Sequence, residues 1–109
     1  MAEDIIDEAI FNELAEDTGS DFVLELVSAF LEEAPGMIAD LKSAHADGDA
    51  DRFRRAAHSI KSNANVFGAS GLSELARKME LDGPDAVDIS ALEDIFTKTS
   101  EALRGRLDD

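Results

Sequence analysis

The sequence of 109 residues contains no cysteine, tryptophan or tyrosine. Without cysteine the chain has no disulfide, no thiolate nucleophile and no cysteine-ligated zinc, and the composition suits a reducing compartment. Long apolar runs are also missing, because no stretch approaches the roughly 18 residues that a membrane helix needs. The opening residues 1–4 are acidic, whereas a secretory signal begins with basic residues. We therefore expect a cytoplasmic protein that does not enter a membrane.

Basic residues are scarce as well. The 10 Lys and Arg residues stand against 25 Asp and Glu, which gives a formal charge of -15. A polyanion gains nothing from counterion release on DNA or RNA, so we do not expect it to bind nucleic acid. The apolar fraction of 44% is nonetheless too high for a disordered acidic tail. A chain of this length suffices for one hydrophobic core, so residues 1–109 are expected to form a single domain. We expect this domain to be a monomer.

Apolar residues follow a helical period along the whole chain, and no stretch alternates as a strand would. The longest apolar stripe keeps its phase from Val23 to Ala44. Pro35 lies inside this stripe, and because the stripe continues beyond it we expect a kink there rather than a chain reversal. Shorter stripes predict further helices over residues 5–18, 53–67, 70–82 and 90–107.

The expected helix boundaries follow from capping residues. Ser20 and Ser70 are expected to cap the helices that follow them, and Ser90 opens a capping-box pattern with Glu93. Gly68 stands where the end of a helix favours a left-handed residue. Five amphipathic helices joined by short turns predict an all-α fold. We expect an antiparallel up-and-down four-helix bundle with an additional short N-terminal helix packed across its end.

One histidine lies away from the apolar stripe of its helix. At about 100° per residue, the apolar positions from Phe53 to Phe67 fall within one arc, and His58 falls on the opposite side. The same outer face carries Arg54, Arg55, Lys61, Ser62 and Asn65. Because basic residues crowd into positions 52–61, a local positive patch is expected around the histidine. The competing interpretation is an ordinary solvated face without a special role.

The turn at Ala69 relates this histidine to a glutamate. If the helices on either side form a tight antiparallel hairpin, residues equidistant from Ala69 lie at the same height. His58 and Glu80 are each eleven positions away, and Lys61 and Arg77 are each eight. Glu80 would then accept a hydrogen bond from one ring nitrogen and leave the other with a free lone pair. Lys61 would meet an approaching anion, so the cluster suits phosphoryl transfer.

The run from Ala57 to Ala69, followed by the helix with Glu80, resembles the histidine-containing phosphotransfer (HPt) domain family. The family hallmark is His-x-x-Lys-Gly, then small residues and Gly-Ala at a hairpin turn; this chain has His58-Ser59-Ile60-Lys61-Ser62 and later Gly68-Ala69. The resemblance implies that His58 accepts a phosphoryl group from a receiver-domain aspartyl phosphate and passes it to another receiver domain. It also implies that Lys61 faces the phosphate and that Glu80 orients the ring.

The chain departs from the family pattern at Ser62, where many members have glycine. Glycine leaves space for an incoming receiver loop, whereas the serine hydroxyl would crowd that loop or bond the phosphoryl oxygens. The residues expected to act on the ring or the phosphoryl group are His58, Lys61, Glu80, Ser62 and Asn65. Those expected to meet the partner are Arg54, Arg55 and Arg77.

The resemblance implies as partners the receiver domains of response regulators and of hybrid histidine kinases. No cofactor is expected on this chain, and Mg²⁺ is expected on the partner receiver domain. Without a glycine-rich phosphate loop we expect neither ATP binding nor kinase activity, so the protein would be a stoichiometric carrier rather than an enzyme. The alternative is a non-catalytic helical adaptor that binds receiver domains or other signalling partners.

No metal site is expected in this chain. His45 has no further ligands at metal spacing, and it is interpreted as a surface or helix-end residue. Asp47, Asp49 and Asp51 suggest a calcium loop, but the downstream ligands of such a loop are missing. A helix cap explains these aspartates better.

Overall fold

The computed structural model describes residues 5–84 and 88–108, without the side chains of Ser20, Leu107 and Asp108. The acidic opening, residues 1–4, lies outside this part. The described residues form helices and no strand, which confirms the all-α prediction. The helices are α1 (Glu8–Thr18), α2 (Ser20–Asp47), α3 (Ala50–Val66), α4 (Ser70–Asp82) and α5 (Ile89–Asp108).

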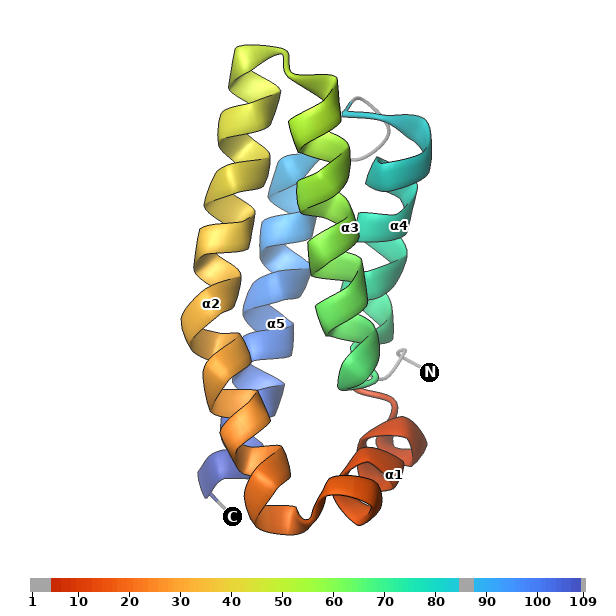
Figure 1. Cartoon of the computed structure of the whole chain (residues 1–109), viewed down its shortest axis with the longest axis vertical. Coiled ribbons are helices and arrows are strands. Elements are labelled where there is room, and N and C mark those ends of the chain that lie inside the picture. The colour runs from red at the N-terminus through yellow and green to blue at the C-terminus, as the bar shows by residue number, and fades with distance from the viewer. Residues whose placement is uncertain (1–4, 85–87, 109) are drawn as a thin grey trace.

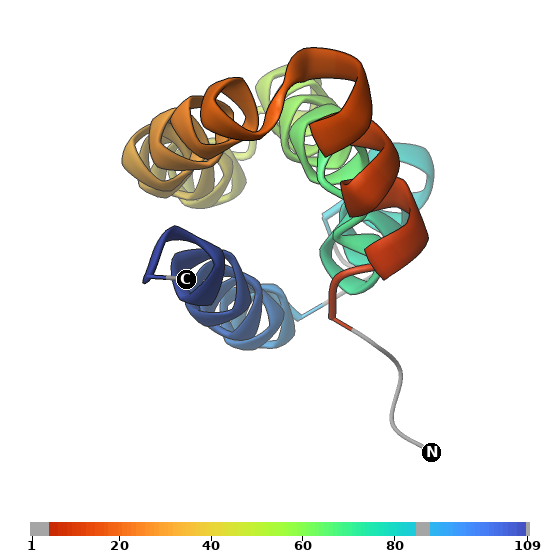
Figure 2. The same ribbon diagram turned by 90° about the horizontal axis from the view of Figure 1, so that it is seen from below.

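Helices α2 to α5 lie side by side, and each runs in the opposite direction to the one before it (Figure 1). Seen from the end, they form a ring that closes where α5 packs against both α2 and α4 (Figure 2). Helix α1 lies across one end of this ring and packs against α2 and α3. Within the described part of the chain, no helix combines the length and the apolar character needed to cross a membrane.

Helix α2 runs through Pro35 without a break, so no chain reversal occurs there. A proline has no N–H, and the carbonyl of Leu31 therefore lacks its usual donor four residues on. Pro35 and Gly36 are exposed, while the apolar stripe is buried on both sides of them. Burial of this stripe offsets the local cost of the proline. The buried residues nearest to it are Phe30, Ala34, Ile38 and Leu41.

The N-caps predicted at Ser20, Ser70 and Ser90 are wrong, because each of these serines is already a helical residue. Neither α2 nor α4 has a side-chain cap, and in α5 the carboxylate of Asp88 accepts the N–H of Ser90 at 3.0 Å. A capping residue lies just before the first helical turn. In α2 and α4 that position belongs to Gly19 and Ala69, which have no side chain that could accept a hydrogen bond.

Aspartates cap two other helices. The carboxylate of Asp7 accepts backbone N–H groups in the first turn of α1, and that of Asp49 does so in α3. The residues from Asp47 to Asp51 therefore mark a helix boundary, as predicted, rather than a calcium loop.

Gly68 joins the turn between α3 and α4 to the start of α1. Its φ of 72° is left-handed, as predicted, and its carbonyl accepts the N–H of Asp7 at 2.7 Å. A Cβ atom at this position would lie 2.9 Å from the carbonyl oxygen of Asp7, so only glycine allows this approach. At the other side of α1, the guanidinium of Arg106 lies 4.7 Å from the centre of the Phe11 ring. These contacts hold α1 across the end of the bundle.

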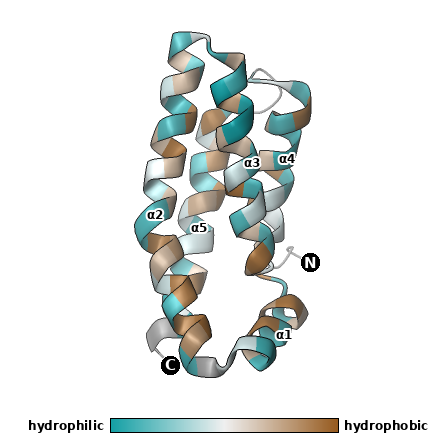
Figure 3. Ribbon diagram, in the orientation of Figure 1, coloured by the Kyte–Doolittle hydropathy of each residue, from teal (hydrophilic) through white to brown (hydrophobic). Residues whose placement is uncertain are grey.

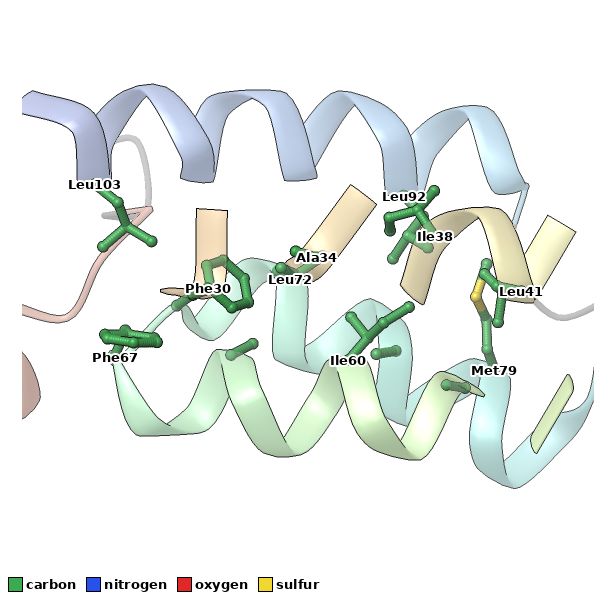
Figure 4. Packing of buried hydrophobic residues seen from close by; sticks show 14 of the residues in the cluster. Phe30, Ala34, Ile38, Leu41, Ile60, Phe67, Leu72, Met79, Leu92 and Leu103 are labelled. Atoms are coloured by element: carbon green, nitrogen blue, oxygen red, sulfur yellow. The ribbon is translucent and has the colours of Figure 1, made fainter. Parts of the chain in front are cut away.

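The core fills the space between the four long helices (Figure 4). Polar residues mark the outward faces of the same helices (Figure 3). In α3 and α4 several fully buried positions are alanines, which let the two helices approach closely; these are Ala57, Ala64 and Ala76. The largest fully buried side chains are Phe53, Leu41, Leu72, Met79, Leu92, Leu103 and Val27.

The α2–α5 pair packs less extensively than the α3–α4 pair. A groove of about 460 Å³ lies between α2 and α5 and is lined by residues that include Pro35, Ile38 and Phe96. A neighbouring hollow of about 170 Å³ shares Pro35 and Phe96 and also includes Ser100. Among the described residues, the buried hydroxyl of Ser100 has no hydrogen-bond partner. The two hollows mark this pair as the less complete side of the bundle.

Candidate functional site on helices α3 and α4

His58 lies in the middle of α3 and faces away from the core. Its side chain is 58% exposed, whereas Ala57 and Ile60 beside it are buried. The helical period therefore placed the histidine on the correct face. An exposed imidazole on a rigid helix is accessible to another protein and keeps a defined position.

Glu80 of α4 holds the ring of His58. The Nδ1 atom of His58 lies 2.7 Å from the Oε2 atom of Glu80. Because an ionised carboxylate only accepts, Nδ1 carries the proton and donates it, and the lone pair of the neutral ring is on Nε2. The predicted hairpin register brings these two residues together as expected. The arrangement leaves a nucleophilic nitrogen at the surface.

Lys61 shares the same carboxylate. Its Nζ atom lies 2.6 Å from Oε1 of Glu80, and the two side chains are only 24% and 17% exposed. The register predicts Arg77 at the height of Lys61, but Arg77 pairs with Glu74 of its own helix at 3.5 Å. The long lysine side chain instead reaches toward the next turn of α4. One glutamate thus accepts from both the histidine and the lysine.

These two contacts lower the pKa of Glu80. Hydrogen bonds from Lys61 and then from His58 hold the pKa of the Glu80 carboxyl below its ordinary value of 4.5. The carboxyl group is ionised at neutral pH even at its ordinary pKa, and the two donors stabilise this ionised form further. Its charge balances that of Lys61, and the cluster with a neutral ring carries no net charge in a protein of formal charge -15.

Ser62 and Asn65 follow His58 on α3 but make different contacts. The Oγ atom of Ser62 lies 3.5 Å from Nε2 of His58, which is the ring nitrogen that Glu80 does not hold. The side-chain oxygen of Asn65 instead accepts the hydroxyl of Ser73 at 2.6 Å, so Asn65 connects α3 to α4. Sequence reasoning missed Ser73. The register contained the signal, because Asn65 and Ser73 are each four positions from Ala69.

The arginines at the start of α3 are paired with aspartates. Arg54 and Arg55 contact Asp51 at 2.5 and 3.6 Å, and Arg52 contacts Asp47 at 3.1 Å. The positive patch expected from the sequence is thus partly balanced by neighbouring carboxylates. Exposed pairs of this kind contribute only about 0–1 kcal/mol, so these arginines exchange partners readily.

The described residues include no group of three or more His, Asp and Glu side chains that could hold a metal ion. His45 is exposed in the last turn of α2, with its ring 6.0 Å from that of Phe53. This is the helix-end position that the sequence predicts for it.

Comparison with family models identifies the family of the chain. Residues 25–109 match the model described as the Hpt domain, and this range includes the whole α3–α4 site. The chain therefore belongs to the Hpt domain family. Members of this family take part in phosphoryl transfer in His-Asp phosphorelays and interact with receiver domains. Neither the comparison with curated proteins nor that with solved structures gives a match.

Proposed function

We propose that this protein is a phosphorelay intermediate that carries a phosphoryl group on His58 between two receiver domains. The 2.7 Å contact between Nδ1 of His58 and Glu80 carries the proposal, because it holds the proton of the neutral ring on Nδ1 and leaves the lone pair on Nε2 as the nucleophile. The frame is an antiparallel up-and-down four-helix bundle with α1 across its end. Residues 1–109 act as one domain and as a monomer.

The accepting step uses the Nε2 lone pair of His58. This lone pair forms the new bond to phosphorus while the bond between phosphorus and the receiver's aspartyl oxygen breaks, and that electron pair remains on the receiver's carboxylate. No proton has to leave Nε2. The phosphorylated ring keeps its proton on Nδ1 and is positively charged, and the Glu80 carboxylate stabilises that charge. The protonated ring is then a good leaving group when the next receiver's aspartate attacks the phosphorus.

Lys61 supplies positive charge for the phosphoryl oxygens. An ammonium group has three N–H donors, and the contact with Glu80 uses one of them. The remaining donors stabilise the charge on the phosphoryl oxygens in the transition state. Glu80 thereby positions both the nucleophile and the cation.

The partners supply what this chain lacks. The receiver domains, of response regulators and of a hybrid histidine kinase, provide the aspartate and its Mg²⁺, and this chain binds no cofactor and no ATP. It acts as a stoichiometric carrier in the cytoplasm. Arg54, Arg55 and Arg77 border the site and face the acidic rim of the receiver. Their weak ion pairs allow them to exchange partners during docking.

The test is transfer of labelled phosphate from receiver domains that have been charged with a small phosphodonor. The parent protein should acquire a label that is labile in acid and stable in base, as expected for a phosphoramidate. His58→Gln should keep the helical circular-dichroism spectrum and lose the label, because the residue is exposed. The matched control His45→Gln should be labelled like the parent.

Two outcomes would contradict the proposal. Label that persists in His58→Gln and disappears in His45→Gln would move the acceptor to the end of α2. A parent protein that binds the charged receiver domains and never acquires label would instead be the helical adaptor.

A further inference from the structure

Ser62 occupies a different place in the cluster from Lys61 and Glu80. Those two residues bond to each other, whereas the Ser62 hydroxyl lies 3.5 Å from Nε2, the reacting atom of His58. In the described residues it has no closer hydrogen-bond partner. The serine stands one helical turn after the histidine on α3, so its hydroxyl lies beside the reacting nitrogen.

The contact is too long to block the nucleophile. A hydrogen bond at 3.5 Å is weak, so an incoming phosphorus atom displaces the hydroxyl from Nε2 at little cost. After transfer, Nε2 has no lone pair left to accept. The phosphoryl oxygens then extend from Nε2 into the space beside the serine, and they are stronger acceptors because they are charged. The Ser62 hydroxyl is positioned to donate to one of them.

This bond is strongest in phosphorylated His58. In the loose transition state of phosphoryl transfer the group moves away from the nitrogen toward its acceptor, while Ser62 stays where α3 holds it. A donor that loses its contact along this path stabilises the starting state more than the transition state.

We propose that Ser62 binds the phosphoryl group on His58 and prolongs the lifetime of the phosphohistidine. The inference rests on the proposed function. It makes this protein a store of phosphoryl groups, slower to hydrolyse and slower to pass the group on than the same chain without the hydroxyl. A hydrogen bond to a charged group at an exposed site is expected to change the lifetime about tenfold.

The experiment compares phosphorylated variants prepared with phosphoramidate, so that labelling does not depend on a receiver domain. Decay of the phosphohistidine is followed by ³¹P NMR, and transfer is then started by adding a receiver domain. Ser62→Ala removes only the hydroxyl and should shorten the lifetime about tenfold. Ser62→Thr keeps a hydroxyl and should retain the long lifetime. Ser59→Ala is the matched control, because Ser59 is exposed on the same helix and lines the α2–α3 side.

Ser62→Gly removes the Cβ atom as well as the hydroxyl, so comparing it with Ser62→Ala separates the effect of the hydroxyl from the effect of side-chain bulk. If the hydroxyl is responsible, Ser62→Gly and Ser62→Ala lose the phosphoryl group at the same rate. Equal lifetimes for the parent, Ser62→Ala and Ser62→Gly would overturn the inference. Failure of the proposed function would look different: phosphoramidate would label the parent, and receiver domains would neither donate to it nor accept from it.

Discussion

Two neighbouring helix pairs of the bundle, α3–α4 and α2–α5, are packed in different ways. The short turn at residues 67–69 joins α3 to α4, and buried alanines let these helices approach closely. Polar side chains connect them from Asn65 and Ser73 near the turn to His58 and Glu80 farther away. The α2–α5 pair has no such short connection and contains an apolar groove and the unpartnered hydroxyl of Ser100.

The difference shows where this fold needs accurate placement. A short turn sets the register of α3 against α4, so side chains that hydrogen-bond across the two helices face each other at defined positions. The α2–α5 pair has only to cover the core, and it tolerates a proline and a groove. We therefore expect polar substitutions between α3 and α4 to alter chemistry, core substitutions there to cost the most stability, and substitutions in α2–α5 to alter stability less and chemistry not at all.

The largest expected effect is the loss of stability when a core residue beneath the α3–α4 site is truncated. Met79→Ala should lower the free energy of unfolding by about 2–5 kcal/mol, because Met79 is fully buried next to Glu80. Ile38→Ala should cost less, because Ile38 lines the groove and already lacks neighbours on one side. Urea denaturation of both variants measures the difference. If Ile38→Ala lost more free energy of unfolding than Met79→Ala, the α2–α5 pair would be the better packed of the two.

The next largest effect is on the rate of phosphoryl transfer, and it distinguishes two lysine–glutamate pairs that join helices. Lys61→Ala should slow transfer from a phosphorylated receiver about a hundredfold, because it removes a charged donor to the phosphoryl oxygens. Receiver binding should change less, since the loss falls on the transition state. Lys42→Ala is the matched control: Lys42 pairs with Glu93 between α2 and α5 at 3.0 Å, and its loss should leave the rate unchanged. Equal rates in all three proteins would remove Lys61 from the mechanism.

Pro35→Ala should stabilise the protein by up to about 3 kcal/mol, because it restores a donor for the Leu31 carbonyl and removes the ring from a helix interior. Gly36→Ala should add only about 0.5–1 kcal/mol, since this exposed helical position has space for a Cβ atom. Thermal unfolding measures both gains, and the rate of phosphoryl transfer should stay at the parent value. A changed transfer rate would show that the two helix pairs are coupled.

The smallest expected effect is the pH dependence of the free energy of unfolding that arises from Glu80. Its pKa is lower in the folded protein than the ordinary 4.5, so the unfolded chain binds more protons as the pH falls. The stabilisation is present in full above that ordinary value and is lost as the pH falls through the folded pKa. In Glu80→Gln this contribution is absent, and the stability gap between parent and variant should narrow below about pH 4.5. A gap that stays constant to about pH 3 would contradict the assignment.

Local rules predicted most of the site. The apolar period placed His58 on the outer face, and counting from Ala69 predicted its contact with Glu80. The same count sets Lys61 level with Arg77 but does not identify Glu80 as the partner of Lys61, because a long side chain reaches a full turn along the neighbouring helix. The N-cap predictions at Ser20 and Ser70 fail because residue type favours a cap, but the turn before each helix decides which residue lies at the cap position, and here these are Gly19 and Ala69.

The sequence by itself determined the helices, the face of each that is buried and the register of α3 against α4. These features depend on a short-range period and on a turn of a few residues, which are both local. Only the tertiary structure decided that Lys61 shares the carboxylate of Glu80, that aspartates pair with the arginines of α3, and that a groove lies between the packed helices α2 and α5. The reach of a long side chain and the fit of distant helices depend on packing, and no local pattern records them.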